Sequence, residues 1–231
     1  MKMLKDRQVT TEYVVEYIMV CCSYRGYWNS QGRPSEKGIA RDTAATVDWM
    51  INDSKIVNGD PKPVAVALWG QSIGAGFATG LAARQELFSS KLSLKALILE
   101  TPFVSIRAML VTLYPQKWLP YRYLWPFLRN HLDSWKALGD MKEGARHHGT
   151  ELPEILILEA GRDELVDREQ TRKLEQRCID LGLAVQRKDI GGALHTEVMG
   201  YHEGRIAVTE TIQRAVMQDD DRPDTVPRNT S

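Results

Sequence analysis

The chain has 231 residues, of which 43% are apolar and 26% charged, and its formal net charge at pH 7 is zero. The length fits one α/β domain, the composition is typical of a soluble globular protein, and nothing in the sequence is basic enough to favour nucleic-acid binding. The three cysteines, Cys21, Cys22 and Cys178, lack the spacing of a disulfide framework or a metal site, so we expect a reducing compartment and no metal or cofactor. The apolar run from Tyr13 to Cys22 is too short for a membrane span and lacks the layout of a signal peptide, which favours a cytoplasmic location.

The first part of the chain predicts one strand and one helix. The residues from Met1 to Thr11 are charged and weakly patterned, whereas Ile18 to Cys22 predict a buried strand. A loop follows, and Ser35 can cap a helix that runs to about Asn52.

The segment from Val64 to Gly76 organises the rest of the chain. Its apolar start, Val64 to Leu68, predicts a buried strand, and Ile73 to Leu87 predict a helix rich in small side chains. Between them stands Gly70-Gln-Ser-Ile-Gly74, the G-x-S-x-G pattern of a nucleophile elbow. Such a turn strains the backbone of the serine, Ser72, and leaves no room for side chains at Gly70 and Gly74. A glycine-rich turn with an incidental serine is the alternative.

The stretch after the next strand interrupts the pattern. Leu94 to Leu99 predict another buried strand, but residues 103–138 are rich in aromatic residues and prolines. This stretch predicts a small helical cap over a pocket, and two short helices on the edge of the sheet are the alternative. Its aromatic residues include Tyr114, Trp118, Tyr121, Tyr123, Trp125, Phe127 and Trp135.

The last part of the chain alternates strands and helices again. Strands are predicted at Ile155 to Leu158 and at Ala184 to Ile190, and the second lies nearer an edge because it is more polar. Helices are predicted at Arg168 to Leu181 and at Glu203 to Met217. This alternation predicts an α/β fold with a mostly parallel sheet. We expect a single domain over residues 1–217 and a disordered tail over residues 218–231.

Candidates for a catalytic triad follow Ser72 along the chain. A serine hydroxyl needs a base within hydrogen-bond reach and a third group that orients the base. Asp163 comes directly after a predicted strand, so its carboxylate can lie at the carboxyl edge of the sheet. His195 belongs to a glycine-rich loop after the last strand and is the candidate base. Glu164 and Asp167 are alternatives for the acid.

The other histidines fit the role of the base less well. His131 precedes the candidate acid in the chain, and His147 and His148 belong to a segment that looks like a polar linker. His202, near the final helix, is the alternative to His195.

Several motifs together resemble the α/β-hydrolase superfamily, and most of all its bud-emergence-type abhydrolase-domain branch. They are Tyr24-Arg-Gly-Tyr27, Gly70 to Gly74, Glu100-Thr-Pro-Phe103 and Asp163-Glu-Leu-Val166, followed by His195. The similarity runs from about Ser23 to Val216. It implies an eight-stranded, mostly parallel sheet, ester or thioester hydrolysis by Ser72, Asp163 and His195, and the Ile73 N–H as one oxyanion donor. It also implies lipidated proteins as a substrate class and association with the endoplasmic reticulum or plasma membrane.

The sequence departs from the family pattern at several positions. Trp28 stands where a glycine is usual, Asp167 where a proline is usual, and Ala193 and Thr196-Glu197 change the surroundings of the base. The family's membrane helix, first three strands and second oxyanion loop have no counterpart, so we expect a chain truncated at its N-terminus. The resulting gap next to Val64–Leu68 requires either a substitute strand from Met1 to Val15 or direct pairing with Ile18–Cys22.

The sequence therefore predicts a serine hydrolase of the carboxylesterase or acyl-thioesterase type, with turnover lowered by the lack of an oxyanion donor. One alternative is a catalytically impaired, hydrolase-like scaffold or truncated product. A serine peptidase of the oligopeptidase type is a further alternative, although no propeller-like segment accompanies the motif.

Overall fold

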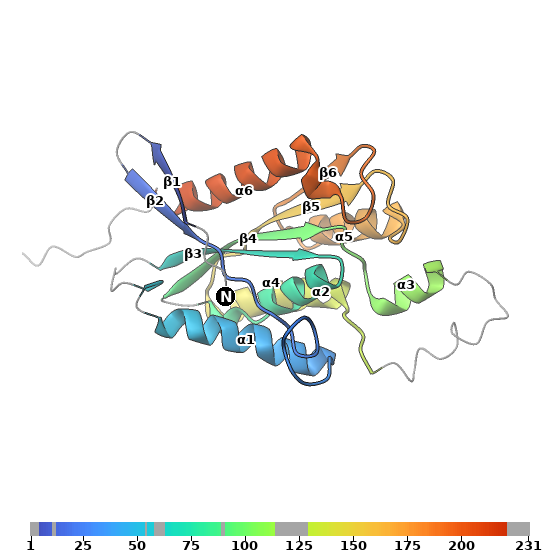
Figure 1. The fold of residues 1–231 in the computed structure, drawn as a ribbon, viewed down its shortest axis with the longest axis horizontal. Helices are drawn as coiled ribbons and strands as arrows, with labels where there is room; N and C mark the ends of the chain where they lie inside the picture. Colours follow the sequence, from blue (N-terminus) through green and yellow to red (C-terminus); the bar gives the residue numbers. More distant parts are fainter. Residues whose placement is uncertain are drawn as a thin grey trace, which may run out of the picture.

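The computed structural model describes residues 5–10, 13–53, 55–57, 63–88, 91–113 and 129–220. Its centre is a parallel four-stranded sheet whose strands follow one another in the order β3-β4-β5-β6. They are β3 (Val64–Gln71), β4 (Leu92–Glu100), β5 (Glu154–Ala160) and β6 (Val185–Ile190). All four run toward the right of Figure 1, so the residues that follow them meet at one edge. The predicted α/β fold is confirmed.

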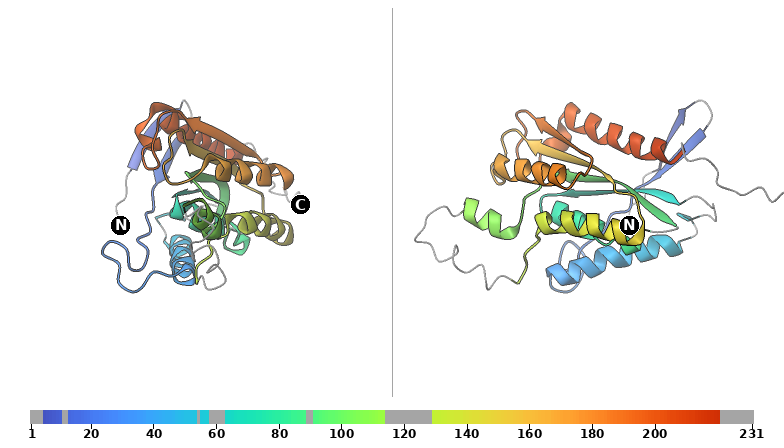
Figure 2. Two further views of the ribbon diagram at one scale, coloured as in Figure 1. Left: turned by 90° about the vertical axis from the view of Figure 1, so that its right-hand side faces the viewer. Right: turned by 180° about the vertical axis from the view of Figure 1, so that it is seen from behind.

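Helices cover both faces of this sheet (Figures 1 and 2). On one face lie α1 (Glu36–Asn52), α2 (Ile73–Ala82), α4 (Ser134–His148) and α5 (Arg168–Asp180), and on the other lies α6 (His202–Asp220). Alternate residues of the inner strands face the two layers. Leu97, Leu99, Ile155 and Ile157 belong to the first hydrophobic core, and Ile98, Leu156 and Leu158 pack with Ala207 and Val208 of α6. Because β4 and β5 are covered on both faces, they are apolar almost throughout.

The N-terminal segment forms its own two-stranded sheet. The strands β1 (Lys5–Thr10) and β2 (Tyr13–Ile18) pair antiparallel and lie beside the carboxyl end of α6 in both figures. The predicted buried strand at Ile18–Cys22 is wrong, since the strand ends at Ile18 and none of the residues 15–23 is buried. Only two residues separate β1 from β2 in the sequence, so the two strands pair at a smaller cost in chain entropy than strands that are distant in the chain. Within the described residues the main sheet therefore has four strands.

The stretch predicted as a cap is partly a core helix. Residues 106–113 form the short helix α3 (Ile106–Leu113), and α4 begins at Ser134 with Asp133 as its N-cap. Leu138 and Met141 of α4 are completely buried and Ser134 is almost so, which places one face of the helix in the core. His147 and His148 form the last turn of α4 and are not part of a linker. The aromatic residues between 114 and 128 lie outside the described residues, and the cap stays a prediction for them.

Other boundaries follow the sequence closely. Ser35 caps α1 by accepting a hydrogen bond from the Gly38 N–H, as predicted. The helix after Ser72 is shorter than predicted, because α2 ends at Ala82 and a 3₁₀ turn, η1 (Gln85–Leu87), follows. The last helix continues past Met217 to Asp220, and residues 221–231 lie outside the described part.

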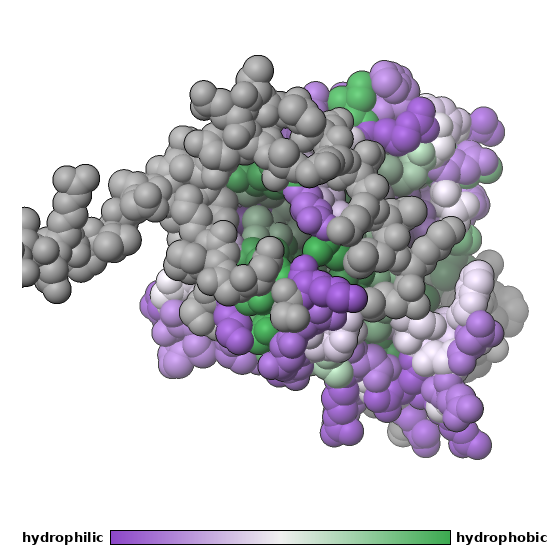
Figure 3. Space-filling view, turned by 60° about the vertical axis from the view of Figure 1, so that its left-hand side comes forward, coloured by the Kyte–Doolittle hydropathy of each residue, from purple (hydrophilic) through white to green (hydrophobic). Residues whose placement is uncertain are grey.

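The amino ends of the strands form the end of the molecule away from Ser72. Figure 3 shows this side: its coloured surface is mainly hydrophilic along the lower and right-hand parts, and hydrophobic side chains lie near the middle. A cleft of about 390 Å³, lined by Pro63, Gln85, Ser93, Leu94 and His148 among others, adjoins the starts of β3 and β4. Since Ser72 follows the opposite end of β3, this cleft is not part of the candidate site. No helix in the described part of the chain has both the length and the apolar character needed to cross a membrane.

Candidate active site

Ser72 occupies a strained turn between β3 and α2. Its backbone angles are φ 51° and ψ −116°, a conformation that residues with side chains rarely adopt. The Ser72 N–H donates to the carbonyl oxygen of Glu100, 2.8 Å away, which joins the turn to the end of β4. Ile73 is the first residue of α2, so its N–H is one of the donors that a helix N-terminus leaves without an intrahelical acceptor.

The two glycines near Ser72 differ in their surroundings. A Cβ atom on Gly70 would lie 2.2 Å from the carbonyl oxygen of Gly74 and 2.6 Å from the nitrogen of Ala75. A Cβ atom on Gly74 would meet no atom within 4 Å in the described structure outside its own helix backbone. The steric requirement predicted for both glycines therefore holds at Gly70 and is wrong at Gly74, because the chain folds back over Gly70 as it enters α2.

Asp163 and His195 lie together at the same edge of the sheet. Asp163 belongs to the loop between β5 and α5, and His195 to the loop after β6. The Nδ1 atom of His195 is 2.9 Å from both carboxylate oxygens of Asp163, and each side chain is only 4% exposed. A carboxylate in this position favours the tautomer with its proton on Nδ1, which leaves Nε2 as a proton acceptor.

The surroundings of Asp163 keep it ionised at neutral pH. The backbone N–H groups of Leu165 and Val166 donate to its Oδ1 atom at 2.9 and 2.8 Å. Burial alone would raise the pKa of Asp163, but the hydrogen bonds from His195, Val166 and Leu165 outweigh burial and lower it below its usual value. A permanently charged acceptor thus faces the imidazole ring.

The two alternative acids have other partners. Glu164 accepts a hydrogen bond from the backbone N–H of His195 at 3.0 Å, and Asp167 caps α5 by accepting from the Glu169 N–H at 2.8 Å. Asp167 has φ −63°, a value that proline shares, so the cap replaces the usual proline without a change of backbone. Of the three carboxylates, Asp163 is the one that contacts the imidazole in the described structure.

The loop that carries His195 is shaped by its backbone. Gly192 has φ 86°, a left-handed conformation that favours glycine. Ala193, which is completely buried, accepts a hydrogen bond from the Arg162 N–H at 2.9 Å and does not have a positive φ. The alanine at position 193 therefore fits, because the neighbouring glycine takes the left-handed conformation.

The other histidines lie elsewhere. His131 precedes α4 and its N–H donates to Glu36, His147 and His148 end α4, and His202 begins α6. Within the described residues none of them contacts Asp163.

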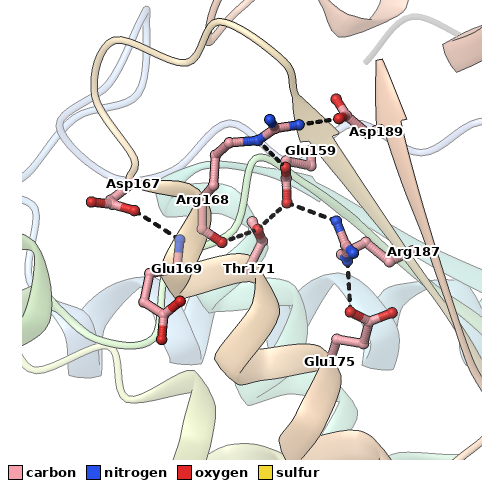
Figure 4. Close-up of polar contacts among 8 residues, drawn as sticks. All are labelled: Glu159, Asp167, Arg168, Glu169, Thr171, Glu175, Arg187 and Asp189. Atoms are coloured by element: carbon pink, nitrogen blue, oxygen red, sulfur yellow. Dashed lines mark hydrogen bonds and ion pairs between the residues drawn. The ribbon is translucent and has the colours of Figure 1, made fainter. Parts of the chain in front are cut away.

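A charged network holds the two ends of the loop that carries Asp163 (Figure 4). Its members are Glu159 of β5, Arg168, Thr171 and Glu175 of α5, and Arg187 and Asp189 of β6. Glu159 is 2% exposed and accepts hydrogen bonds from all three of its partners, with Arg187 at 3.1 Å. Because the network joins the end of β5, the start of α5 and β6, it also holds the strand that leads to His195.

A second anchored loop lies between β2 and α1. Arg25 forms a two-point ion pair with Asp42 of α1, at 2.6 and 2.9 Å, and the ring of Tyr24 lies 5.3 Å from that of Phe77 in α2. Trp28 in this loop has φ 52° and is 93% exposed. A glycine, which the resemblance leads us to expect at this position, would adopt this conformation without strain.

The sequence analysis assigns no role to two buried carboxylates near the site, although one of them begins the motif Glu100-Thr-Pro-Phe103. Glu100 is 3% exposed at the end of β4, and Glu159 is 2% exposed near the end of β5. Each is a charged residue that directly follows a run of at least four apolar residues, 96–99 before Glu100 and 155–158 before Glu159, and this is the sequence signal that could have identified them.

Comparisons of the sequence with known proteins find relatives that match part of the chain. No family model matches the chain. An uncharacterised protein of Mycobacterium tuberculosis is 32% identical over 151 residues, which cover 65% of this chain and 44% of that protein. The lysophosphatidylserine lipase ABHD12 of Danio rerio is 33% identical over 177 residues, covering 76% of this chain and 42% of the lipase. The chain thus spans less than half the length of these relatives.

Solved structures share the fold at lower identity. The esterase Pf2001 of Pyrococcus furiosus superposes with a TM-score of 0.55 at 17% identity, over 87% of this chain and 69% of the esterase. A fungal esterase of Rhizomucor miehei gives a TM-score of 0.52 at 15% identity, over 80% of this chain and 60% of the esterase. Together with the sheet order and the helices on both faces, these likenesses in sequence and fold show that the chain belongs to the α/β-hydrolase superfamily.

Proposed function

We propose that the protein is a serine hydrolase that cleaves carboxylic esters, with Ser72 as the nucleophile on a nucleophile elbow, His195 as the base and Asp163 as the acid. The observation that carries the proposal is the buried contact between His195 Nδ1 and Asp163, at the same sheet edge as the strained Ser72 turn. Acid, base and nucleophile follow the ends of three parallel strands, which is the arrangement that a triad on this fold needs.

In this mechanism Ser72 Oγ attacks the acyl carbonyl carbon while His195 Nε2 takes the hydroxyl proton. Asp163 keeps the Nδ1 proton in place and stabilises the imidazolium. The Ile73 N–H donates to the oxyanion of the tetrahedral intermediate. When the intermediate collapses, the leaving alcohol or thiol takes the proton from His195, and a water molecule then hydrolyses the acyl-enzyme by the same steps. The lowered turnover expected from a single oxyanion donor stays a prediction.

The surface next to these residues supports an acyl substrate. Ile73, Leu165 and Leu194 are 48%, 45% and 36% exposed, and each is within two residues of a proposed catalytic residue. Exposed apolar side chains that adjoin a site of this kind favour a hydrocarbon chain as part of the substrate. The likeness to lysophosphatidylserine lipases of Danio rerio and Bos taurus points to lipid monoesters as the class to test first. Acyl thioesters, including lipidated proteins, belong to the same proposal.

A fluorophosphonate probe tests the proposal. It should label the wild-type protein, whereas Ser72→Ala and His195→Ala should not be labelled. The control is Ser23→Ala, which removes a serine of the loop before α1 and should leave labelling unchanged. Hydrolysis is then compared for short-chain and long-chain esters, lysophosphatidylserine and an acyl thioester. Absence of labelling in a protein shown to be folded would refute the proposal and favour a hydrolase-like scaffold without turnover.

A further inference from the structure

Glu164 is an exposed carboxylate that the mechanism above does not use, although it contacts the proposed base. It directly follows Asp163 in the loop between β5 and α5. Its Oε2 atom accepts a hydrogen bond from the backbone N–H of His195 at 3.0 Å. Asp163 contacts Nδ1 of the same histidine at 2.9 Å. Two consecutive residues therefore hold the ring and the main chain of His195 at separate points.

The conformation of the acid loop allows both carboxylates to reach the same histidine. Asp163 Oδ1 accepts the N–H groups of Leu165 and Val166 at 2.9 and 2.8 Å, so the chain turns tightly after Asp163. Glu164 lies within this turn, and its side chain extends to the loop after β6. The bond joins residues that are 31 positions apart, so it is a contact between two loops and not a local cap.

The preceding N–H group of the histidine loop has a different acceptor. The Leu194 N–H donates to Oε2 of Glu197 at 3.1 Å, and Glu197 belongs to the same loop as Leu194. That bond stabilises the shape of the loop but does not tie it to the acid loop. The bond from His195 to Glu164 does so at the base itself.

We propose that Glu164 is a positioning residue, which holds the main chain of His195 so that Nε2 keeps its place relative to Ser72. The inference rests on the proposed function. Asp163 fixes the tautomer of the ring, but a ring held at one nitrogen can still move with its backbone. A displacement of about 1 Å between reacting groups can lower the rate of reaction about 100-fold. The role requires an acceptor at the right distance, and not a charge, because the donor is a neutral N–H group.

The exposure of Glu164 separates this role from a purely structural one. The side chain lies at the surface, whereas His195 is 3% exposed. Water can replace an exposed carboxylate as the acceptor, so removal of the side chain should change the stability of the fold little. A water molecule does not tie His195 to the acid loop, however. Loss of turnover without loss of stability is therefore the expected result.

The test compares substitutions that separate reach from charge. Glu164→Gln keeps the length and an acceptor oxygen, so kcat for ester hydrolysis should stay within about 3-fold of the wild type. Glu164→Asp keeps the charge but withdraws the carboxylate by about 1.5 Å, which breaks the bond. This variant and Glu164→Ala should lower kcat about 10-fold or more, with KM changed by less than about 3-fold. Urea denaturation should give similar midpoints for all of them.

Glu86→Ala is the matched control and should leave kcat and KM unchanged. Glu86 is also an exposed glutamate that accepts a hydrogen bond, from Arg84 at 2.9 Å, and it lines the cleft at the opposite end of the molecule. Wild-type kcat in Glu164→Asp and Glu164→Ala would overturn the inference. A loss in Glu164→Gln as large as in Glu164→Ala would also overturn it, because the charge and not the bond would then matter. If Glu164→Ala does not fold, the comparison of Glu164→Asp with Glu164→Gln decides the question alone.

A second measurement does not depend on turnover. Exchange of the His195 amide hydrogen with solvent is followed by NMR in Ser72→Ala, alone and combined with Glu164→Asp or Glu164→Gln. The amide should exchange about 5-fold or more faster in the combination with Glu164→Asp, and at an unchanged rate in the combination with Glu164→Gln. Equal rates in all three proteins would overturn the inference. Absence of phosphonate labelling in the folded wild type would overturn the proposed function instead.

Discussion

The Nδ1 atom of His195 lies 2.9 Å from each carboxylate oxygen of Asp163, and both side chains are almost completely buried. This contact joins two loops that are more than thirty residues apart in sequence by one charged interaction. Because the imidazole and the carboxylate are both withdrawn from water, a change at Asp163 should alter the protonation state of His195 more than it alters the packing around it.

Asp163→Asn should lower turnover by about 10⁴-fold while leaving the protein folded. The amide oxygen can still accept the N–H groups of Leu165 and Val166, but the amide does not stabilise the imidazolium. Steady-state ester hydrolysis measures the loss, and circular dichroism checks the fold. Glu164→Gln and Asp167→Asn are the controls, because each keeps an acceptor for its backbone N–H partner. If either control is the more damaging change, Asp163 is not the acid.

Gly70→Ala and Gly74→Ala should have opposite effects. The first places a Cβ atom 2.2 Å from the Gly74 carbonyl oxygen, so it should cost about 2 kcal/mol or more of stability and abolish turnover. The second adds a methyl group at a helical position that no other part of the described structure approaches within 4 Å, so it should stabilise the protein by up to ~1 kcal/mol. Urea denaturation measures both. Equal destabilisation by the two substitutions would contradict the turn geometry.

Trp28→Gly should stabilise the protein by about 0.5–1 kcal/mol. Relief of the left-handed conformation is worth ~1–2 kcal/mol, and the added freedom of glycine in the unfolded chain offsets ~0.5–1 kcal/mol of it. The side chain contributes little packing because it is 93% exposed. Thermal unfolding of Tyr27→Gly provides the control, since Tyr27 does not have a positive φ and should lose stability. A lower melting temperature for Trp28→Gly would show that the indole has a partner.

The sequence predicts those parts of the fold that depend on local chemistry. The strands β3 to β5 are mainly apolar segments flanked by turn residues, and α1 begins at a serine cap, so their approximate bounds follow from composition and spacing. The strand at Ile18–Cys22 is wrong because an apolar run alone does not identify its pairing partner, and here β2 pairs with β1. The predicted cap wrongly includes the start of α4, because the buried residues of this helix are few among many charged ones.

The candidate site is also predictable only where it depends on local sequence and chain order. Chain order and strand ends identify Ser72, Asp163 and His195 as candidates, whereas choosing between Asp163, Glu164 and Asp167 needs the side-chain directions, which spacing does not provide. The places of Glu100 and Glu159 in the site are not predictable from local sequence, because both side chains bond to strands that are distant in the chain. The space around Gly70 differs from that around Gly74 because of the path that the chain takes into α2. The G-x-S-x-G pattern, which has a glycine at each end, does not reveal this difference.

The pH dependence of stability should separate Glu100 from Glu159. The folded protein raises the pKa of Glu100 above the usual 4.5, so in the window above that value it binds more protons than the unfolded chain. The contribution of Glu100 to stability therefore decreases as the pH rises through this window. Urea denaturation at a series of pH values between 4 and 8 should show a weaker decrease for Glu100→Gln than for the wild type. A parallel curve for the variant would contradict the raised pKa.

Glu159 should show the opposite sign. Burial would raise its pKa, but hydrogen bonds from Thr171 and Arg168 and the charge of Arg187 lower it below the usual 4.5. The contribution of Glu159 to the stability of the folded protein is therefore complete above pH 4.5. It is lost as the pH falls through the lower pKa of the folded state. Glu159→Gln should therefore destabilise the protein most at neutral pH, with a smaller difference at pH 4. Glu169→Gln, which changes an exposed residue 3.8 Å from Lys173, should have little effect at either pH.

Hydrogen exchange should distinguish the N-terminal hairpin from the main sheet. Amides of residues 14–22 should exchange far faster than those of β4 and β5, because an isolated two-stranded sheet is marginally stable in water and residues 19–22 are not in a strand. Mass spectrometry of exchanged peptides measures the difference. Strong protection of residues 14–22, equal to that of β4, would mean that the hairpin folds cooperatively with the main sheet.

The loops that carry Asp163 and His195 are joined by more than their side chains. The Gly161 N–H donates to Ile190, the Arg162 N–H donates to Ala193, both at 2.9 Å, and Glu164 accepts from the His195 N–H. The loops that carry Asp163 and His195 should therefore move together. Ser72 is held separately, at the end of β3 and by its bond to the end of β4. A bulky substrate that pushes against this edge would change the separation of nucleophile and base and leave the acid–base contact intact. Tolerance to substrate size would then be governed by how far the loops after β5 and β6 can shift together relative to the Ser72 turn.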